Sequence, residues 1–134
     1  MDIKEFIRQD DIQKLLAAEN LDGIYEECHV DSRNKLTEFF LHNNINPLDY
    51  VTIIYNQMYS KLTITEIIIP NHIISIYDLA FYDCKSLISI TIPNSVKYIT
   101  FYAFIHCPNL TIKCEENSYA HNYALENNIK FELI

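Results

Sequence analysis

The pattern of apolar and polar residues changes near residue 63. Before this point apolar residues recur at intervals of three and four, which is typical of amphipathic helices. Beyond it apolar and polar residues alternate, which is typical of strands with one buried face. We therefore predict an α+β fold with two parts: a bundle of short helices over residues 1–62 and a strand-rich region over residues 63–134.

The first part predicts several short helices. The apolar residues of 3–7 and those of 12–16 fall on different helical faces, so we expect a break at residues 9–11. Asp10 with Gln13 has the spacing of an N-cap and its capping-box partner.

Two further helices are predicted downstream. Asp31-Ser32 is expected to cap one that Asn43-Asn44 ends. Asn46-Pro47 then predicts the start of another, because Asn caps helices and Pro fits the first helical position. Its apolar residues continue at helical spacing as Leu48, Val51, Tyr55, Met58 and Tyr59.

The second part contains one 23-residue pattern twice, over residues 64–86 and 87–109. Eight of the 23 aligned positions are identical: Ile67/Ile90, Ile69/Ile92, Pro70/Pro93, Asn71/Asn94, Ile76/Ile99, Ala80/Ala103, Phe81/Phe104 and Cys84/Cys107. A fixed period of this length predicts a solenoid of stacked repeats. Each copy begins as a strand that ends at its proline, since proline cannot donate to a strand ladder.

Residues 110–134 start a third copy and then depart from it. Leu110–Cys114 has the pattern of a strand, Asn117-Ser118 has that of a helix cap, and residues 129–134 alternate as a last strand. A degenerate last repeat is expected to close a solenoid. We expect the helices of residues 1–62 to cap its other end, because two repeats cannot bury their own ends.

The repeats resemble the BspA-like leucine-rich repeats. The similarity lies in Ile90–Val96, followed by Ala103-Phe104 and Cys107, and in the closing segment Cys114–Ala120. This resemblance covers about residues 62–134 and implies a curved solenoid with a parallel sheet on its concave face, used for binding proteins, without catalytic residues.

The chain departs from the pattern of that family at two turns. Its members commonly have glycine before the aromatic stretch and again just before the cysteine. Tyr77 and Thr100 occupy the first place here, and Asp83 and His106 occupy the second.

Charge narrows the range of partners. The chain of 134 residues carries a formal net charge of −8, and residues 1–50 hold eleven acids against five bases. Such a chain repels phosphate backbones, so direct nucleic-acid binding is disfavoured. We expect the partner to be a protein, and a basic binding surface on that partner would suit the negative charge of this chain. The sequence leaves the oligomeric state open.

The sequence predicts a cytoplasmic location. No basic and apolar leader opens it, and no run of 18 apolar residues occurs. Cys84 and Cys107 share one repeat position, so they are expected to be reduced core residues stacked as neighbours.

The sequence gives little support for a catalytic, cofactor or metal site. The single glycine excludes a phosphate-binding glycine-rich loop. The histidines have no nucleophile or acid at motif spacing, and no Cys-x-x-Cys pair is present. We expect no catalytic residue, no cofactor and no metal ion, although an enzyme or zinc site assembled across the fold remains an alternative.

Two surfaces are candidates for partner binding. If the isoleucines shared by the copies point inward, the intervening residues form the exposed face of the strands. The acidic helical region supplies the second surface. The candidate residues are Glu66, Ile68, Ser89 and Thr91 on the strands, and Asp10, Asp11, Glu26 and Glu27 in the helical region.

Two hypotheses of function follow. The first is a non-enzymatic protein–protein interaction module that binds on the concave strands, the acidic helices or both. The alternative is a small acidic intracellular inhibitor of a nucleic-acid-handling protein, comparable to the anti-CRISPR proteins of phages and mobile elements, because a basic groove attracts an array of negative charge.

Overall fold

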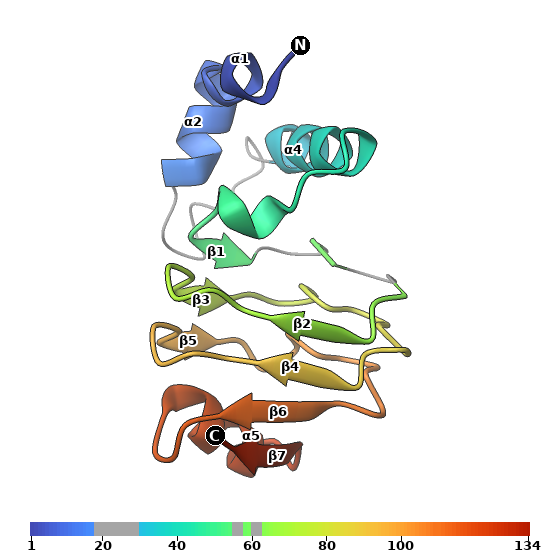
Figure 1. The fold of residues 1–134 in the computed structure, drawn as a ribbon, viewed down its shortest axis with the longest axis vertical. Coiled ribbons are helices and arrows are strands. Elements are labelled where there is room, and N and C mark those ends of the chain that lie inside the picture. The colour runs from blue at the N-terminus through green and yellow to red at the C-terminus, as the bar shows by residue number, and fades with distance from the viewer. Residues whose placement is uncertain (18–29, 55–57, 60–62) are drawn as a thin grey trace. The chain divides into compact units, whose positions relative to one another are not determined.

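The computed structural model describes residues 1–17, 30–54, 58–59 and 63–134. The chain forms two compact units, residues 1–52 and residues 53–134, which Figure 1 shows in blue to green and in green to red. The predicted boundary after residue 62 lies later in the chain. Short helices precede a solenoid of stacked parallel sheets, so the predicted fold class is confirmed.

The helical unit begins with two short helices and the predicted break between them. Its described elements are α1 (Ile3–Ile7), α2 (Asp10–Ala17), α4 (Val30–His42) and one turn of 3-10 helix (Pro47–Asp49). Asp2 caps α1, since its carboxylate accepts a hydrogen bond from the Glu5 N–H at 2.9 Å.

Two predicted helix caps are wrong. Asp10 is already the first residue of α2, and the side chain of Gln13 donates to the carbonyl of Ile7 instead of closing a capping box. Asp31-Ser32 lies inside α4, which includes Val30. In both places the polar residues that were predicted as caps lie within the helix itself.

Helix α4 has an apolar stripe and the predicted end. Leu36 and Phe40 are buried, and Phe39 stacks on Phe6 of α1 with ring centroids 3.9 Å apart. Asn44 ends the helix in the left-handed region at φ 54°. The Ile45 N–H then bonds back to the Phe40 carbonyl at 2.9 Å, a common way to satisfy a helix C-terminus.

The helix predicted from Asn46-Pro47 to Tyr59 is wrong beyond its first turn. The Asn46 side chain does accept from the Leu48 N–H at 3.1 Å, but only one 3-10 turn follows. Ile53–Ile54 instead forms strand β1. The β-branched run of residues 51–54 favours a strand, and pairing with the next coil stabilises it there.

The repeat unit consists of two parallel sheets. Its strands are β1 (Ile53–Ile54), β2 (Glu66–Ile68), β3 (Ser75–Ile76), β4 (Ser89–Thr91), β5 (Tyr98–Ile99), β6 (Thr111–Cys114) and β7 (Lys130–Leu133). One sheet has the order β1-β3-β5 and the other β2-β4-β6-β7. Three coils contribute one strand to each sheet (β1/β2, β3/β4 and β5/β6), and β7 adds a fourth strand to the second sheet, as Figure 1 shows. Equivalent residues of successive coils therefore form ladders.

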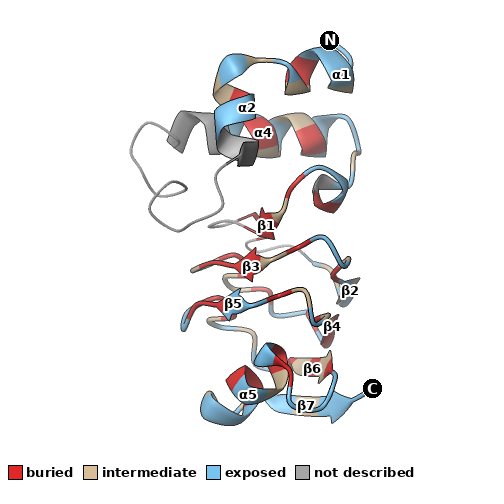
Figure 2. Ribbon diagram, turned by 90° about the vertical axis from the view of Figure 1, so that its left-hand side faces the viewer, coloured by how far each residue is buried: buried red, intermediate tan, exposed pale blue. Residues whose placement is uncertain are grey.

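An aromatic ladder runs through the repeat unit. Phe81 is fully buried and lies between Tyr59 and Phe104, with both centroid distances at 5.2 Å. Ala80 and Ala103 beside it are also fully buried, since only a small side chain fits next to stacked rings. In Figure 2 buried residues accordingly line the coils. Tyr59 lies 22 residues before Phe81, so it belongs to an earlier copy of the same repeat.

The cysteines follow the same repeat. The Cys84 thiol donates to the Tyr59 carbonyl at 2.8 Å, and the Cys107 thiol donates to the Phe81 carbonyl at 3.0 Å. Hydrogen bonding with Cys84 and burial raise the pKa of the Cys107 thiol above its usual range. These two residues and Cys114 form no disulfide, as the sequence predicted for Cys84 and Cys107. The two thiols therefore form hydrogen bonds to the preceding coil, with Cys84 buried and Cys107 half-buried.

Helix α5 (Tyr119–Glu126) takes the place of a further coil at the end of the ladder. Ser118 caps it as predicted, because its hydroxyl accepts from the His121 N–H at 3.1 Å. Tyr123 packs edge-on against Phe104, and its hydroxyl donates to the Thr100 carbonyl at 2.9 Å. Burial raises the pKa of Tyr123, so the phenol remains a donor there.

Two turns have a backbone that favours glycine although they lack it. Asp83 and His106 have φ values of 58° and 61°, in the left-handed region. They hold the place before the cysteine where the resembling family commonly has glycine. The turn geometry is therefore kept, with Asp and His tolerating the conformation better than most residues with a Cβ.

We expect His106→Gly to be more stable than His106→Ala by about 1 kcal/mol, because both lose the imidazole and only alanine keeps a Cβ in the left-handed region. Urea unfolding of the two variants measures this difference. Exposed Lys97 has no positive φ and supplies the control, where alanine should be the more stable variant. Equal stability at residue 106 would contradict the strained turn.

Candidate functional site

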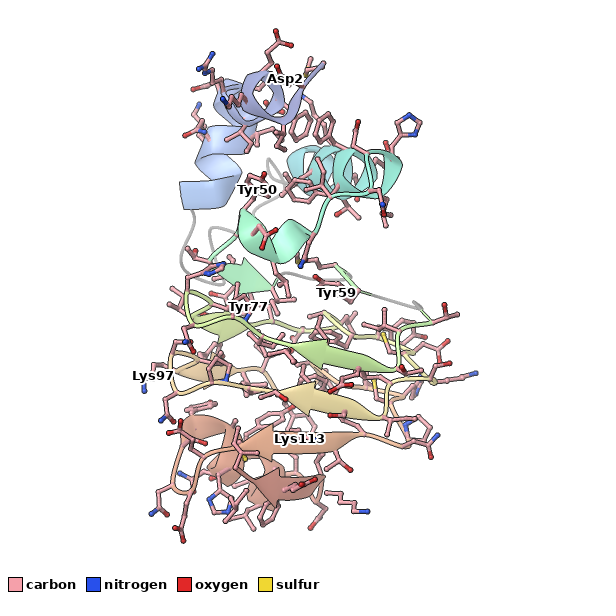
Figure 3. The ribbon with its side chains drawn as sticks, viewed as in Figure 1. Asp2, Tyr50, Tyr59, Tyr77, Lys97 and Lys113 are labelled. Atoms are coloured by element: carbon pink, nitrogen blue, oxygen red, sulfur yellow. The ribbon has the colours of Figure 1, made fainter. Side chains whose placement is uncertain are left out.

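The first candidate surface is the outer face of the four-stranded sheet, here called the strand face. Strand register places two rows of residues across it. One row is Glu66, Ser89, Thr111 and Lys130, and the other is Ile68, Thr91, Lys113 and Glu132. Figure 3 labels Lys113 on β6. The predicted residues Glu66, Ile68, Ser89 and Thr91 therefore do lie on neighbouring strands of one sheet.

Their exposure differs. Ile68 is 67% exposed, Glu66 is exposed and Thr91 is half-buried. Ser89 is only 9% exposed, and its hydroxyl makes no hydrogen bond within the described residues. Ser89 can therefore offer little surface to a partner. The strand face is mostly polar, with Ile68 as its large exposed apolar residue.

The second candidate surface consists of Tyr98, Phe101 and Tyr102, here called the aromatic corner. It lies in β5 and in the turn that follows it. The three side chains are 45%, 70% and 50% exposed. Phe101 and Tyr102 pack edge to face, with centroids 4.8 Å apart. Aromatic side chains are enriched at protein interfaces, and Phe101 and Tyr102 already hold each other in place.

The aromatic corner was not among the surfaces predicted from the sequence. Its signal lay in the comparison of the two copies, since Phe101 and Tyr102 align with Asp78 and Leu79. The surrounding positions Ala80/Ala103 and Phe81/Phe104 are shared core residues. The change from Asp-Leu to Phe-Tyr just before these shared residues adds apolar area that the core does not use.

The third candidate surface is the acidic helical region. Asp10 pairs with Lys14 at 3.0 Å, and Asp11 pairs with Lys35 at 3.2 Å. Glu26 and Glu27 lie outside the described residues. Both described aspartates thus have a lysine beside them, which reduces the negative potential that they offer to a basic partner.

A shallow cleft lies between α1 and α4 of the helical unit. It is lined by Phe6, Asn34, Lys35, Glu38, Phe39, His42 and Asn43. The Lys35 ammonium lies 5.9 Å from the centre of the Phe6 ring, near enough for a cation–π contact. Acidic and basic groups are mixed in this lining, so it favours neither anions nor cations.

The described residues contain no cluster of side chains arranged for metal binding, and their thiols are poorly suited to nucleophilic catalysis. Across residues 1–17, 30–54, 58–59 and 63–134, no three His, Cys, Asp or Glu side chains are placed to hold a metal ion. Burial raises the pKa of the Cys114 thiol, and hydrogen bonding with Cys84 together with burial raises the pKa of the Cys107 thiol. Both shifts disfavour the thiolate that a nucleophile needs. Among the same residues, no helix has the length and apolar character to cross a membrane.

Comparison with known proteins agrees with the repeat architecture. Residues 52–134 match the sequence model described as "BspA type leucine rich repeat region (6 copies)". The match begins one residue before β1, so it includes the coil that the predicted helix obscured. No curated protein and no solved structure matches the chain.

Proposed function

Because the chain belongs to the BspA-type leucine-rich repeat family, we propose that it is a non-enzymatic module that binds a partner protein. Leucine-rich repeat domains generally bind proteins. Stacked coils hold exposed side chains at fixed spacing on a rigid support, which lowers the entropy that binding must overcome.

The aromatic corner is the observation that carries this proposal. Phe101 is 70% exposed on a turn whose backbone is held by hydrogen bonds between coils. The Leu79 N–H donates to the Tyr102 carbonyl at 3.1 Å, and the Phe81 N–H donates to the Ala103 carbonyl at 3.0 Å. A bulky aromatic on such a rigid turn has the character of an interface hot spot.

The strand face is the second candidate surface for the same function. Exposed Ile68 lies next to Thr91 on the neighbouring strand, with Lys113 beyond it. This arrangement has one apolar anchor among polar groups. It exposes less apolar surface than the aromatic corner, so we rank it second. The acidic residues Asp10 and Asp11 rank third because lysines pair with them.

The test compares matched double variants in affinity capture from the cells that express the chain. Phe101→Ser/Tyr102→Ser is expected to lose the captured partner, with an affinity at least about 30-fold weaker, as hot-spot residues predict. Ile68→Ser/Thr91→Ala removes the strand-face candidates and should leave the affinity within about threefold. Both variants change exposed or half-exposed residues, so thermal unfolding should show that they fold like the parent chain.

The reverse pattern would place the partner on the strand face. A third variant, Asp10→Asn/Asp11→Asn, tests the acidic surface together with a salt titration. Binding that weakens steeply with salt and is lost in this variant would favour an acidic inhibitor of a basic protein. Binding that all three variants retain would contradict each of these surfaces.

A further inference from the structure

Strand β7 forms one edge of the four-stranded sheet. Its strand partner in the described part of the chain is β6. The Ile134 N–H donates to the Cys114 carbonyl at 3.0 Å, which fixes which residues of β7 face β6. Because backbone groups alternate along a strand, Glu132 also faces β6, whereas the N–H and C=O groups of Phe131 and Leu133 face away from it. The edge therefore offers two donors and two acceptors to another strand.

Apolar side chains surround this edge. Leu133 and Ile134 are 44% and 65% exposed, and Leu125 of the adjoining helix α5 is 53% exposed. Figure 2 shows that β7 is largely exposed. An exposed apolar edge strand is a ready template for pairing with another chain, and proteins usually protect such edges. The free backbone groups and the apolar side chains thus occur together.

The sequence of β7 is complementary to itself in an antiparallel arrangement centred on Phe131. In that register Lys130 lies opposite Glu132 of the second copy, and Glu132 opposite its Lys130. Phe131 lies opposite its own equivalent, and Ile129 opposite Leu133. The Ile129 N–H already donates to the Ala124 carbonyl at 2.9 Å, so only the Ile129 carbonyl is left to accept from the Leu133 N–H in that pair. Opposite charges directly across a strand pair are stabilising, and two such pairs form at once.

The direction of the backbone groups limits the possible registers, and charge selects among them. Outward backbone groups belong to odd-numbered residues, so only registers that pair odd with odd can form the bonds. The two neighbouring registers of that kind are centred on Lys130 and on Glu132, and each places the charged residue at its centre opposite its own equivalent. Like charges across a strand pair are destabilising. The register centred on Phe131 avoids this and adds the two ion pairs.

We propose that β7 is a self-association site, at which two copies of this chain pair their β7 strands antiparallel. Two four-stranded sheets then join into one sheet of eight strands. The interface is isologous and closes after two copies, because the same edge is used on both. Neither the aromatic corner nor the strand-face anchor Ile68 takes part, so this inference does not depend on the proposed function.

Sedimentation equilibrium of the whole 134-residue chain tests the proposal. We expect a monomer–dimer equilibrium over roughly 1–500 µM, since one strand pair with few side chains belongs to the small interface class. Glu132→Lys places two lysines opposite each other at both ends of the pair, and we expect the dissociation constant to rise at least about tenfold. Lys130→Glu should have a similar effect.

Three further variants separate this edge from other causes. Lys130→Glu/Glu132→Lys restores opposite charges and should return the dissociation constant to within about threefold of the parent value. Glu66→Lys makes the same charge change on β2, at the far side of the sheet, and should leave it unchanged. Leu133→Pro removes an outward N–H without removing a bond to β6, and should abolish the dimer while circular dichroism remains that of a folded chain.

A chain that stays monomeric throughout this concentration range would overturn the proposal. So would a dimer that responds to neither charge reversal nor Leu133→Pro, because it would use another surface. Weakening by both single reversals without rescue by the double variant would overturn the register centred on Phe131.

Discussion

Replacing Phe81 with alanine is expected to destabilise the repeat unit by about 3–5 kcal/mol. The side chain is fully buried, with one ring stacked on each side of it. Truncation would leave a cavity between Tyr59 and Phe104 that the neighbouring coils cannot close, because each is fixed by its own strand pairing. The loss therefore combines the transfer of the ring with the cavity and both stacking contacts.

Urea unfolding followed by far-ultraviolet circular dichroism measures this loss. Phe101→Ala is the matched control, since it removes the same ring from a position that is 70% exposed. The control should change the free energy of unfolding by less than about 0.5 kcal/mol. A loss below about 1 kcal/mol for Phe81→Ala would contradict the aromatic ladder and with it the stacking of the coils.

The ladder could be predicted from sequence because its positions repeat. Ile67 with Ile90 and Phe81 with Phe104 recur at one spacing, and strand pairing places Ile67 in register with Ile90. The short strands β3 and β5, later in each repeat, were not predicted. Two-residue strands carry too little alternation to be recognised without the neighbouring coil.

The first coil was missed because two periods coincide in it. Met58 and Tyr59 continue a helical spacing from Leu48, but they also align with Ala80 and Phe81 at an offset of 22 residues. This first offset is one residue shorter than the 23-residue period of the later copies, and the difference concealed the repeat. Pairing of β1 with β3 and stacking of Tyr59 on Phe81 are tertiary interactions, and these decided the outcome over local helix preference.

The candidate surfaces, too, were predicted only in part. Alternation placed Ile68 and Glu66 on the exposed side of β2, as the structure shows. Alternation places Ser89 on the same outward side, but it could not show that the Ser89 side chain is only 9% exposed. The aromatic corner depends on how far a turn projects, which neither period nor composition reports. Whether a partner uses these surfaces stays a prediction.

Ile90→Ala is expected to cost about 2–5 kcal/mol, whereas Thr91→Ala next to it should cost less than about 0.5 kcal/mol. Ile90 is fully buried and lies in register between Ile67 and Ile112. Its loss leaves a cavity in the isoleucine ladder at the centre of the sheet. Thr91 is half-buried on the strand face, where water can replace most of what the side chain contacted.

The same denaturation experiment on these two variants tests the register of the four-stranded sheet. Side chains alternate between the two faces, so a slip of one residue would exchange the buried and outward positions along β4. In that case Thr91→Ala would be the costly change, and Ile68 would point into the core. Equal losses at both positions would contradict a sheet with one buried face. A large loss at Ile90 with little at Thr91 would support the register that places Ile68, Thr91 and Glu132 outward, on which both the strand face and the β7 pairing depend.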